Sequence, residues 1–217
     1  RSPPMDFADT AEDEAFRAEL TGWLDDHLPK FLAEWAEDQD LAEGQAPTDE
    51  AGDSAGAGAG GVISQMERRR AWQRTLNEGR WAAITWPKEW GGREATVSQN
   101  VIYSEVMARY RTPGIYNANG LWQIGPMIIR WGTQEQKDLW LNSILYAEDH
   151  WCQGFSEPEA GSDLANLRLL AIADGDDYVL DGQKIWCTTA HYAKWGLFLV
   201  RTDPTAIERG AKHEGIT

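Results

Sequence analysis

The stretch CQGFSEPEAGSDLANLR, residues Cys152 to Arg168, lies where the pattern of this 217-residue sequence changes. Apolar residues recur at helical spacing before it, and short β-prone runs follow it. Within it, Pro158 fixes one backbone angle, and Gly161 leaves out a side chain where a ligand could come close to the backbone. A simple connector between two domains has the same composition, so the stretch alone leaves both interpretations open.

Residues 1–147 are predicted to form an all-α helical domain. Thr96 and Thr133 each begin a capping box, T-V-S-Q and T-Q-E-Q. The basic residues Arg68 to Arg70 are interpreted as a solvated helix face. The expected helices are Thr10–Leu28, with an extension through Phe31 and Trp35, then Val62–Glu78, Thr96–Arg109, Leu121–Trp131 and Thr133–Leu145. Because Leu121–Trp131 is apolar almost all round, we expect this helix to be buried.

A Gly/Ala/Ser-rich segment, residues 43–61, interrupts the helical pattern and is predicted to be a flexible insertion. Gly56, Gly58 and Gly61 match the spacing G-x-G-x-x-G of dinucleotide-binding turns. That interpretation requires a strand in front of the glycines, and the preceding residues are polar and poor in β-formers. We therefore do not assign nucleotide binding to this segment.

Residues 148–217 are predicted to be antiparallel β-structure, which makes the fold class α+β. Asp174-Gly175 and Asp181-Gly182 are hairpin signals, and Trp195–Thr202 reads as a further strand. Three or four strands with an open edge form a poor barrel by themselves.

The composition excludes several classes of function. With 20 Lys and Arg against 35 Asp and Glu, the formal charge is −15, which disfavours nucleic acid and anionic membrane surfaces as partners. No signal-peptide pattern or membrane-spanning apolar run occurs, so we expect a soluble, cytoplasmic protein. Cys152 and Cys187 have no metal or redox spacing and are interpreted as small core residues, and we expect no metal site.

A second chemistry-bearing stretch is GQKIWCTTAHYAKWG, residues Gly182 to Gly196. On an extended strand, Trp186 and Thr188 would share one face. An aromatic ring beside a hydroxyl can pack on a flat heterocycle and hydrogen-bond its edge, although a core Trp with a satisfied Thr fits the same residues.

Together these stretches resemble the acyl-CoA dehydrogenases, flavoenzymes with an α-helical N-terminal domain, a β-barrel middle domain and an α-helical C-terminal domain. The resemblance covers nearly the whole chain and is carried by the stretches WAAITWPKEWGG, GTQEQKDLWL, FSEPEAGSDLANLR and DGQKIWCTTAHYAKWGLFLVRTD. The residues in these stretches are most similar to those of actinobacterial members. It implies a helical domain over 1–147, the first part of an incomplete antiparallel β-barrel over 148–217, and a C-terminal domain absent from this sequence.

The resemblance also implies roles for individual residues. FAD would be bound by Gln153, Phe155 and Ser156 along the flavin ring, by Ser162 at the pyrophosphate, by Trp186 beside the ring, by the backbone of Cys187, and by Thr188 near flavin N5. Ser162 would also contact the CoA part of the substrate. The implied reaction, part of fatty acid or lipid catabolism, removes the α-proton of an acyl thioester and transfers the β-hydride to N5.

The same resemblance implies an electron-transfer flavoprotein as the electron acceptor and a dimer or tetramer. The catalytic carboxylate belongs to the missing C-terminal domain, so no acidic residue here is nominated and the chain alone is expected to be inactive. The family usually has Gly at the position of Glu159, whose charge would oppose a pyrophosphate. Two alternatives stay open: a non-catalytic subunit that scaffolds a partner, and a family relative that oxidises another substrate.

Overall fold

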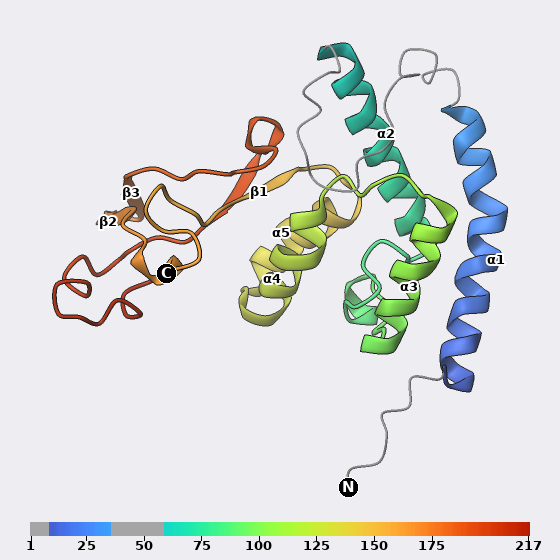
Figure 1. The fold of residues 1–217 in the computed structure, drawn as a ribbon, viewed down its shortest axis with the longest axis horizontal. Coiled ribbons are helices and arrows are strands. Elements are labelled where there is room, and N and C mark those ends of the chain that lie inside the picture. The colour runs from blue at the N-terminus through green and yellow to red at the C-terminus, as the bar shows by residue number, and fades with distance from the viewer. Residues whose placement is uncertain (1–8, 36–58) are drawn as a thin grey trace, which may run out of the picture. The chain divides into compact units, whose positions relative to one another are not determined.

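The computed structural model describes residues 9–35 and 59–217 (Figure 1). The chain divides into two compact units at Glu148, a helical unit and a small β unit that begins at Asp149. Most of the predicted flexible insertion 43–61, including Gly56 and Gly58, lies outside the described residues. Its last three residues belong to a helix that begins at Ala59.

The described part of the helical unit contains five α-helices, with α1 packed against α3, and α5 in contact with α2 and α4 (Figure 1). Four of the five helices predicted from the sequence are present, although their ends differ by a few residues, and the fifth, Leu121–Trp131, differs from its prediction. The helical elements are α1 (Ala11–Glu34), α2 (Ala59–Glu78), the short 3₁₀ turn η2 (Lys88–Trp90), α3 (Val97–Tyr110), the π-helical turn η3 (Gly120–Ile124), α4 (Gly125–Trp131) and α5 (Gln134–Leu145).

The predicted capping boxes are confirmed at the starts of α3 and α5. The Thr96 hydroxyl accepts from the Gln99 amide and the Thr133 hydroxyl from the Gln136 amide, while each glutamine side chain accepts from the threonine backbone. These contacts satisfy amides that the first helical turn leaves without partners. Helix α1 has the same arrangement between Thr10 and Asp13.

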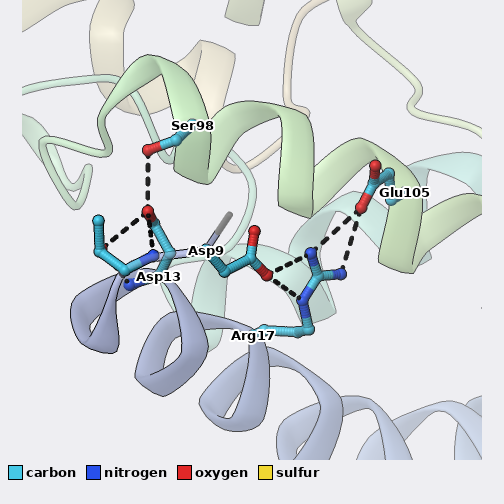
Figure 2. A network of polar contacts seen from close by, with 6 residues as sticks. Asp9, Asp13, Arg17, Ser98 and Glu105 are labelled. Atoms are coloured by element: carbon cyan, nitrogen blue, oxygen red, sulfur yellow. Dashed lines mark hydrogen bonds and ion pairs between the residues drawn. The ribbon is translucent and has the colours of Figure 1, made fainter. Parts of the chain in front are cut away.

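The start of α1 is tied to α3 by polar side chains (Figure 2). Asp13 is buried, accepts a 2.8 Å hydrogen bond from the Thr10 hydroxyl and accepts another of 2.9 Å from Ser98 on α3. Hydrogen bonds from Thr10 and then Ser98 lower the pKa of Asp13 below its usual value. One turn further on, Arg17 bridges Asp9 and Glu105, but this group is largely exposed.

Tryptophans fill the core of the helical unit. Trp72, Trp81 and Trp86 are fully buried, and Trp72 lies 5.0 Å from the Phe31 ring centroid. Such large side chains remove much apolar area from water, so a few of them hold several helices together.

The segment Leu121–Trp131 is not the continuous buried helix predicted from its composition. It begins as the π turn η3 and continues as α4, and Trp122 and Trp131 are 66% and 77% exposed. Apolar composition alone does not distinguish a buried face from an exposed one.

The π turn leaves one carbonyl without a helical donor. The Gly125 amide donates to Gly120, and the next possible donor to Leu121 is residue 126, a proline without an N–H. The indole Nε1 of Trp86 supplies the missing hydrogen bond to the Leu121 oxygen at 2.8 Å. A Cβ on Gly125 would stand 1.9 Å from the Trp86 ring, so only glycine allows this approach.

The basic face predicted on α2 is only partly solvated. Arg70 donates to the carbonyls of Ala147 and Glu148, just after the C-terminal end of α5, at 2.6 and 3.1 Å. The buried Gln73 donates to the Ile144 carbonyl, and its own oxygen accepts from the Asn117 amide. Side chains of α2 therefore donate hydrogen bonds to carbonyls at and just after the end of α5. Cationic side chains are well suited to such positions, because the carbonyls at a helix C-terminus lack helical donors.

The β unit contains four short strands: β1 (Trp151–Gly154), β2 (Leu170–Asp174), β3 (Asp177–Asp181) and β4 (Trp195–Phe198). The first Asp-Gly signal is confirmed, because β2 and β3 form an antiparallel hairpin in which Gly175 takes a positive φ of 64°. The strand predicted from Trp195 is also present, although it ends at Phe198.

Two parts of the β prediction are wrong. Strands β1 and β4 pair in parallel, not antiparallel, with Trp151 opposite Trp195. The second signal, Asp181-Gly182, is followed by irregular backbone because the next residues pair by hydrogen bonds with the loop after β1. Within the described residues the sheets are two-stranded and no closed barrel is present.

Candidate functional site

The loop after β1, residues 155–162, is organised by a buried carboxylate. Glu157 and Ala160 exchange backbone hydrogen bonds of 3.0 Å, which closes a tight turn around Pro158. The Glu157 side chain accepts from the amides of Arg168 and Leu169 at 2.6 and 2.9 Å. The carboxylate thus ties this loop to the backbone just before β2.

Lys184 completes the environment of this carboxylate. Its ammonium lies 2.9 Å from Glu157 and donates to the Phe155 carbonyl at 3.0 Å, and both charged side chains are over nine-tenths buried. Burial alone raises the pKa of Glu157, but the Lys184 and backbone hydrogen bonds outweigh it, so the pKa lies below its usual value. A buried pair of this kind is costly unless further hydrogen bonds accompany it, and here the Arg168 and Leu169 amides and the Phe155 carbonyl supply them.

The pair fixes the second chemistry-bearing stretch beside the first. The Ile185 amide donates to the Ser156 carbonyl at 2.9 Å, and the ring of the buried His150 lies 2.7 Å from the Thr189 hydroxyl. Two of the segments named from sequence therefore run side by side. One carries Gln153, Phe155 and Ser156, and the other carries Trp186, Cys187 and Thr188.

Trp186 and Thr188 do not share the face of an extended strand, as their spacing predicted. Trp186 has a positive φ of 58°, and the Thr188 amide donates back to the Trp186 carbonyl at 2.9 Å. The backbone turns here, and the Trp186 ring is 83% exposed. The sequence could not show this, because a tryptophan in the left-handed region is rare.

Ser162 lies further along the loop and is exposed. The neighbouring Asp163 forms a 2.8 Å ion pair with Lys212. Ser162 therefore lies on its own turn, whereas the other six predicted site residues lie in the two segments that Lys184 and Ile185 join.

Glu159, the residue at odds with the family pattern, points into solvent. Its side chain is 73% exposed, and its carboxylate lies 3.9 Å from the Arg168 guanidinium. An exposed charge beside a cation is strongly screened, so Glu159 opposes a nearby anion less than its sequence position suggested.

Three structurally important side chains were missed by sequence reasoning: Glu157, Lys184 and Arg201. Arg201 is 1% exposed, and its guanidinium donates to the carbonyls of Leu167, Glu214, Ala165 and Lys212. Charged residues are rarely fully buried, so a buried charge marks a residue with a structural role. The sequence does not show which of its charged residues are buried, and these three were therefore not identified from it.

Among residues 9–35 and 59–217 no group of three His, Cys, Asp or Glu side chains could hold a metal ion. The same residues contain no helix long and apolar enough to cross a bilayer.

Comparison with known proteins agrees with the two-part fold. Residues 62–148 match the model of the acyl-CoA dehydrogenase N-terminal domain, and residues 152–217 match that of the acyl-CoA dehydrogenase middle domain. The chain belongs to the acyl-CoA dehydrogenase family. The resemblance predicted from sequence is therefore confirmed.

Mycobacterial family members are among its similar relatives. Acyl-CoA dehydrogenase IpdE1 of Mycobacterium tuberculosis is 36% identical over 205 residues, which cover 94% of this chain and 47% of the relative. IpdE1 of Mycolicibacterium smegmatis is 35% identical over 95% of this chain and 50% of its own length. This chain therefore spans about half the length of these relatives.

A solved structure has a similar fold. The ChsE4–ChsE5 complex from Mycobacterium tuberculosis matches with a TM-score of 0.69 and 31% identity, over 98% of this chain and 46% of that one. A structure described as the Tcur3481–Tcur3483 steroid acyl-CoA dehydrogenase matches with a TM-score of 0.68 and 29% identity, over 98% and 48%.

Proposed function

We propose that this chain forms the N-terminal and first middle-domain part of an FAD-dependent acyl-CoA dehydrogenase that converts an acyl-CoA to the 2-enoyl-CoA. The observation that carries this proposal is the pairing of the loop 153–156 with the turn 186–188 through Glu157 and Lys184. The middle domain would be the start of a β-barrel, which residues beyond those described would complete.

The residues present are suitable for binding FAD. Thr188 is exposed and Ser156 is half-buried, so both hydroxyls are accessible, and the exposed Trp186 ring offers an apolar surface beside them. Hydroxyls and backbone amides suit the polar edge of a flavin, and an indole suits its ring. In the proposed site Gln153, Phe155 and Ser156 line the ring, the Cys187 backbone contributes a polar group, and Thr188 donates near N5.

The cofactor, when bound, accepts the hydride, and the protein's contribution is position and polarity. Thr188 and Trp186 would orient the ring, while Ser162, on its separate exposed turn, would contact the pyrophosphate and the CoA part of the substrate. We assign no catalytic base among the acidic residues of this chain. The carboxylate that removes the α-proton would lie in a C-terminal domain outside this sequence, so this chain alone should not turn over substrate.

The similar structures add a second substrate class to the proposal. Because one structure of similar fold is described as a steroid acyl-CoA dehydrogenase, we include steroid-derived acyl-CoA thioesters beside fatty acyl-CoA among the candidates. The proposed partners are an electron-transfer flavoprotein and further subunits in a homo- or hetero-oligomer, and the proposed location is the cytoplasm.

The test uses the full-length protein that contains this chain. We expect a flavin absorption band at about 450 nm, which is a property of the cofactor, and bleaching of that band by acyl-CoA without oxygen. No flavin band after FAD addition would overturn the enzyme proposal and favour a scaffolding subunit. A flavin that acyl-CoA thioesters of both classes fail to bleach would favour oxidation of another substrate.

Thr188→Val tests the role of the hydroxyl. We expect slower flavin reduction with nearly unchanged folding, because one hydrogen bond at the ring edge is lost. Thr205→Val is the control, since its hydroxyl donates to Asp203 in the turn after β4 and contacts no proposed flavin residue. Equal reduction rates in wild type and Thr188→Val would remove the proposed role.

A further inference from the structure

The turn 186–188, which carries proposed flavin contacts, is held by hydrogen bonds on both sides. On one side the Ile185 amide donates to the Ser156 carbonyl at 2.9 Å. On the other side the Thr189 hydroxyl lies 2.7 Å from Nε2 of His150, the residue before β1. The first and last of the three residues between these anchors are exposed, so packing does little to fix the turn.

Thr189 has a backbone conformation that its branched side chain disfavours. Its φ is 60° and its ψ is 14°, which lie in the left-handed helical region. Branched side chains rarely adopt this region, and a residue stays there only when its surroundings hold it. Trp186, at the start of the turn, also has a positive φ, of 58°. The turn therefore needs contacts from outside itself, and the His150 ring supplies one at Thr189.

His150 holds the residues after the turn as well as the turn itself. Its carbonyl accepts hydrogen bonds from the amides of Lys194 and Trp195 at 3.0 and 3.3 Å. The neighbouring Asp149 accepts from the Lys194 ammonium at 3.0 Å and from the Trp195 indole at 2.9 Å. Because His150 is 5% exposed, its ring has little freedom to move. The segment between Thr189 and Trp195 is thus fixed at both ends by the two residues that precede β1.

The Thr189 hydroxyl has one proton, and its two contacts decide where that proton points. Its oxygen lies 2.6 Å from the Thr188 carbonyl oxygen, which can only accept a hydrogen bond. Two oxygens this close need a proton between them, so the hydroxyl donates to Thr188 and accepts from His150. Nε2 of His150 therefore carries a proton. The imidazole, the hydroxyl and the Thr188 carbonyl form one chain of hydrogen bonds.

We propose that His150 and Thr189 are positioning residues for the flavin contact assigned to Thr188, an inference that rests on the proposed function. The chain of hydrogen bonds fixes the Thr188 carbonyl, and with it the direction in which the exposed Thr188 side chain points. Neither His150 nor Thr189 has to touch the flavin for this role. Sequence reasoning missed the pair, because 39 positions separate the two residues and no local spacing links them.

Removal of either end of the His150–Thr189 hydrogen bond should release the turn. In the full-length protein, His150→Leu and Thr189→Val should each weaken FAD binding about fivefold, which is the effect of one hydrogen bond. The double variant should lose no more affinity than either single variant, because both groups act through the same contact. Thr189→Ser keeps the hydroxyl and His150→Gln keeps an N–H donor, so both should retain most of the wild-type affinity.

The experiment measures the FAD dissociation constant of the flavin-free full-length protein, the absorption band of the bound flavin, and hydrogen exchange in peptides that contain residues 186–192. His150→Leu and Thr189→Val should shift the band and speed the exchange, because amides in this segment donate to carbonyls of the turn. Thr205→Val removes a hydroxyl from the turn after β4 and should leave all three measurements unchanged. Thr189 is only half-buried, so its variants decide the question if His150→Leu fails to fold.

FAD dissociation constants within about twofold of wild type in both His150→Leu and Thr189→Val would overturn the positioning role. The same conclusion follows if Thr189→Ser loses as much affinity as Thr189→Val, since the hydroxyl would then not be the link. Additive losses in the double variant would also overturn it, because the two residues would act separately. If the wild-type protein binds no FAD, the proposed function fails, whereas hydrogen exchange still decides whether His150 and Thr189 anchor the turn.

Discussion

The helical unit and the β unit are stabilised by different kinds of contact. The largest fully buried side chains of the helical unit are Trp72, Trp81 and Trp86. In the β unit the large side chains that are fully buried are Arg201 and Leu167. Its apolar cluster is small, consisting of Leu169, Ala171 and Val200, and every residue of β3 is exposed.

The difference in contacts matches a difference in proposed role, with the helical unit as the scaffold and the β unit as the carrier of the proposed site. Apolar burial is strong but has little directional preference, whereas hydrogen bonds and ion pairs hold groups at defined distances and angles. The β unit uses Glu157, Lys184 and Arg201 to position its loops, and these loops carry the proposed flavin contacts. The two units should therefore respond differently to apolar and polar substitutions.

The largest expected effect is in the tryptophan core. Trp72→Ala should lower the free energy of unfolding of the helical unit by about 4–5 kcal/mol, because a large cavity and two aromatic contacts are lost. Urea unfolding followed by circular dichroism at the helix band measures it. Tyr178→Ala on exposed β3 is the control and should change stability by less than about 0.5 kcal/mol. Equal losses would contradict the contrast between the units.

A somewhat smaller effect is expected at the buried ion pair. Glu157→Gln leaves the Lys184 charge buried without a counter-ion, and we expect a local loss of about 3 kcal/mol. Hydrogen exchange at the Arg168 and Leu169 amides, which donate to Glu157, reports it. The double variant Glu157→Gln, Lys184→Met should recover part of the loss. Unchanged exchange in the single variant would show that the pair does not organise the loop.

The same carboxylate should make the β unit sensitive to acid. Because the folded pKa of Glu157 lies below its usual 4.5, the unfolded chain takes up the proton first. Its contribution is complete above that pH and is lost as the pH falls through the folded pKa. Amide protection at Leu169 should fall as the pH drops below the usual pKa of 4.5 in the wild type but change little in Glu157→Gln. Parallel pH profiles would assign the acid sensitivity to another group.

The smallest effect is expected on the surface network between α1 and α3. Arg17→Met should lower stability by less than about 1 kcal/mol, and by less still at high salt, because its carboxylate partners are partly or mostly exposed. Ser98→Ala, which removes a donor to the buried Asp13, should cost about 1 kcal/mol and depend little on salt. A larger effect for Arg17 than for Ser98 would reverse this ranking.

Local patterns predicted the helical unit well. The capping boxes at Thr96 and Thr133 and the hairpin turn at Gly175 depend on residues only a few positions apart, so they could be read from the sequence. The family resemblance then selected the stretches around Ser156 and Trp186.

Long-range pairings could not be read in this way. The ion pair of Glu157 and Lys184 and the parallel pairing of β1 with β4 join positions far apart in sequence, and no periodicity encodes them. The exposure of Trp122 and the left-handed backbone of Trp186 likewise depend on the surrounding chain. For that reason the sequence could nominate residues for the proposed site, but it could not show the contacts that hold their segments.

The π turn at η3 ties the evolution of positions 86, 125 and 126 together. While proline occupies position 126, the Leu121 carbonyl needs a donor from outside the helix, and the Trp86 indole fills that need only if residue 125 has no side chain. A descendant that gains an N–H at position 126 can satisfy Leu121 within the helix, which relaxes selection on the other two positions. Across relatives, tryptophan, glycine and proline at these positions should be inherited and lost as a set.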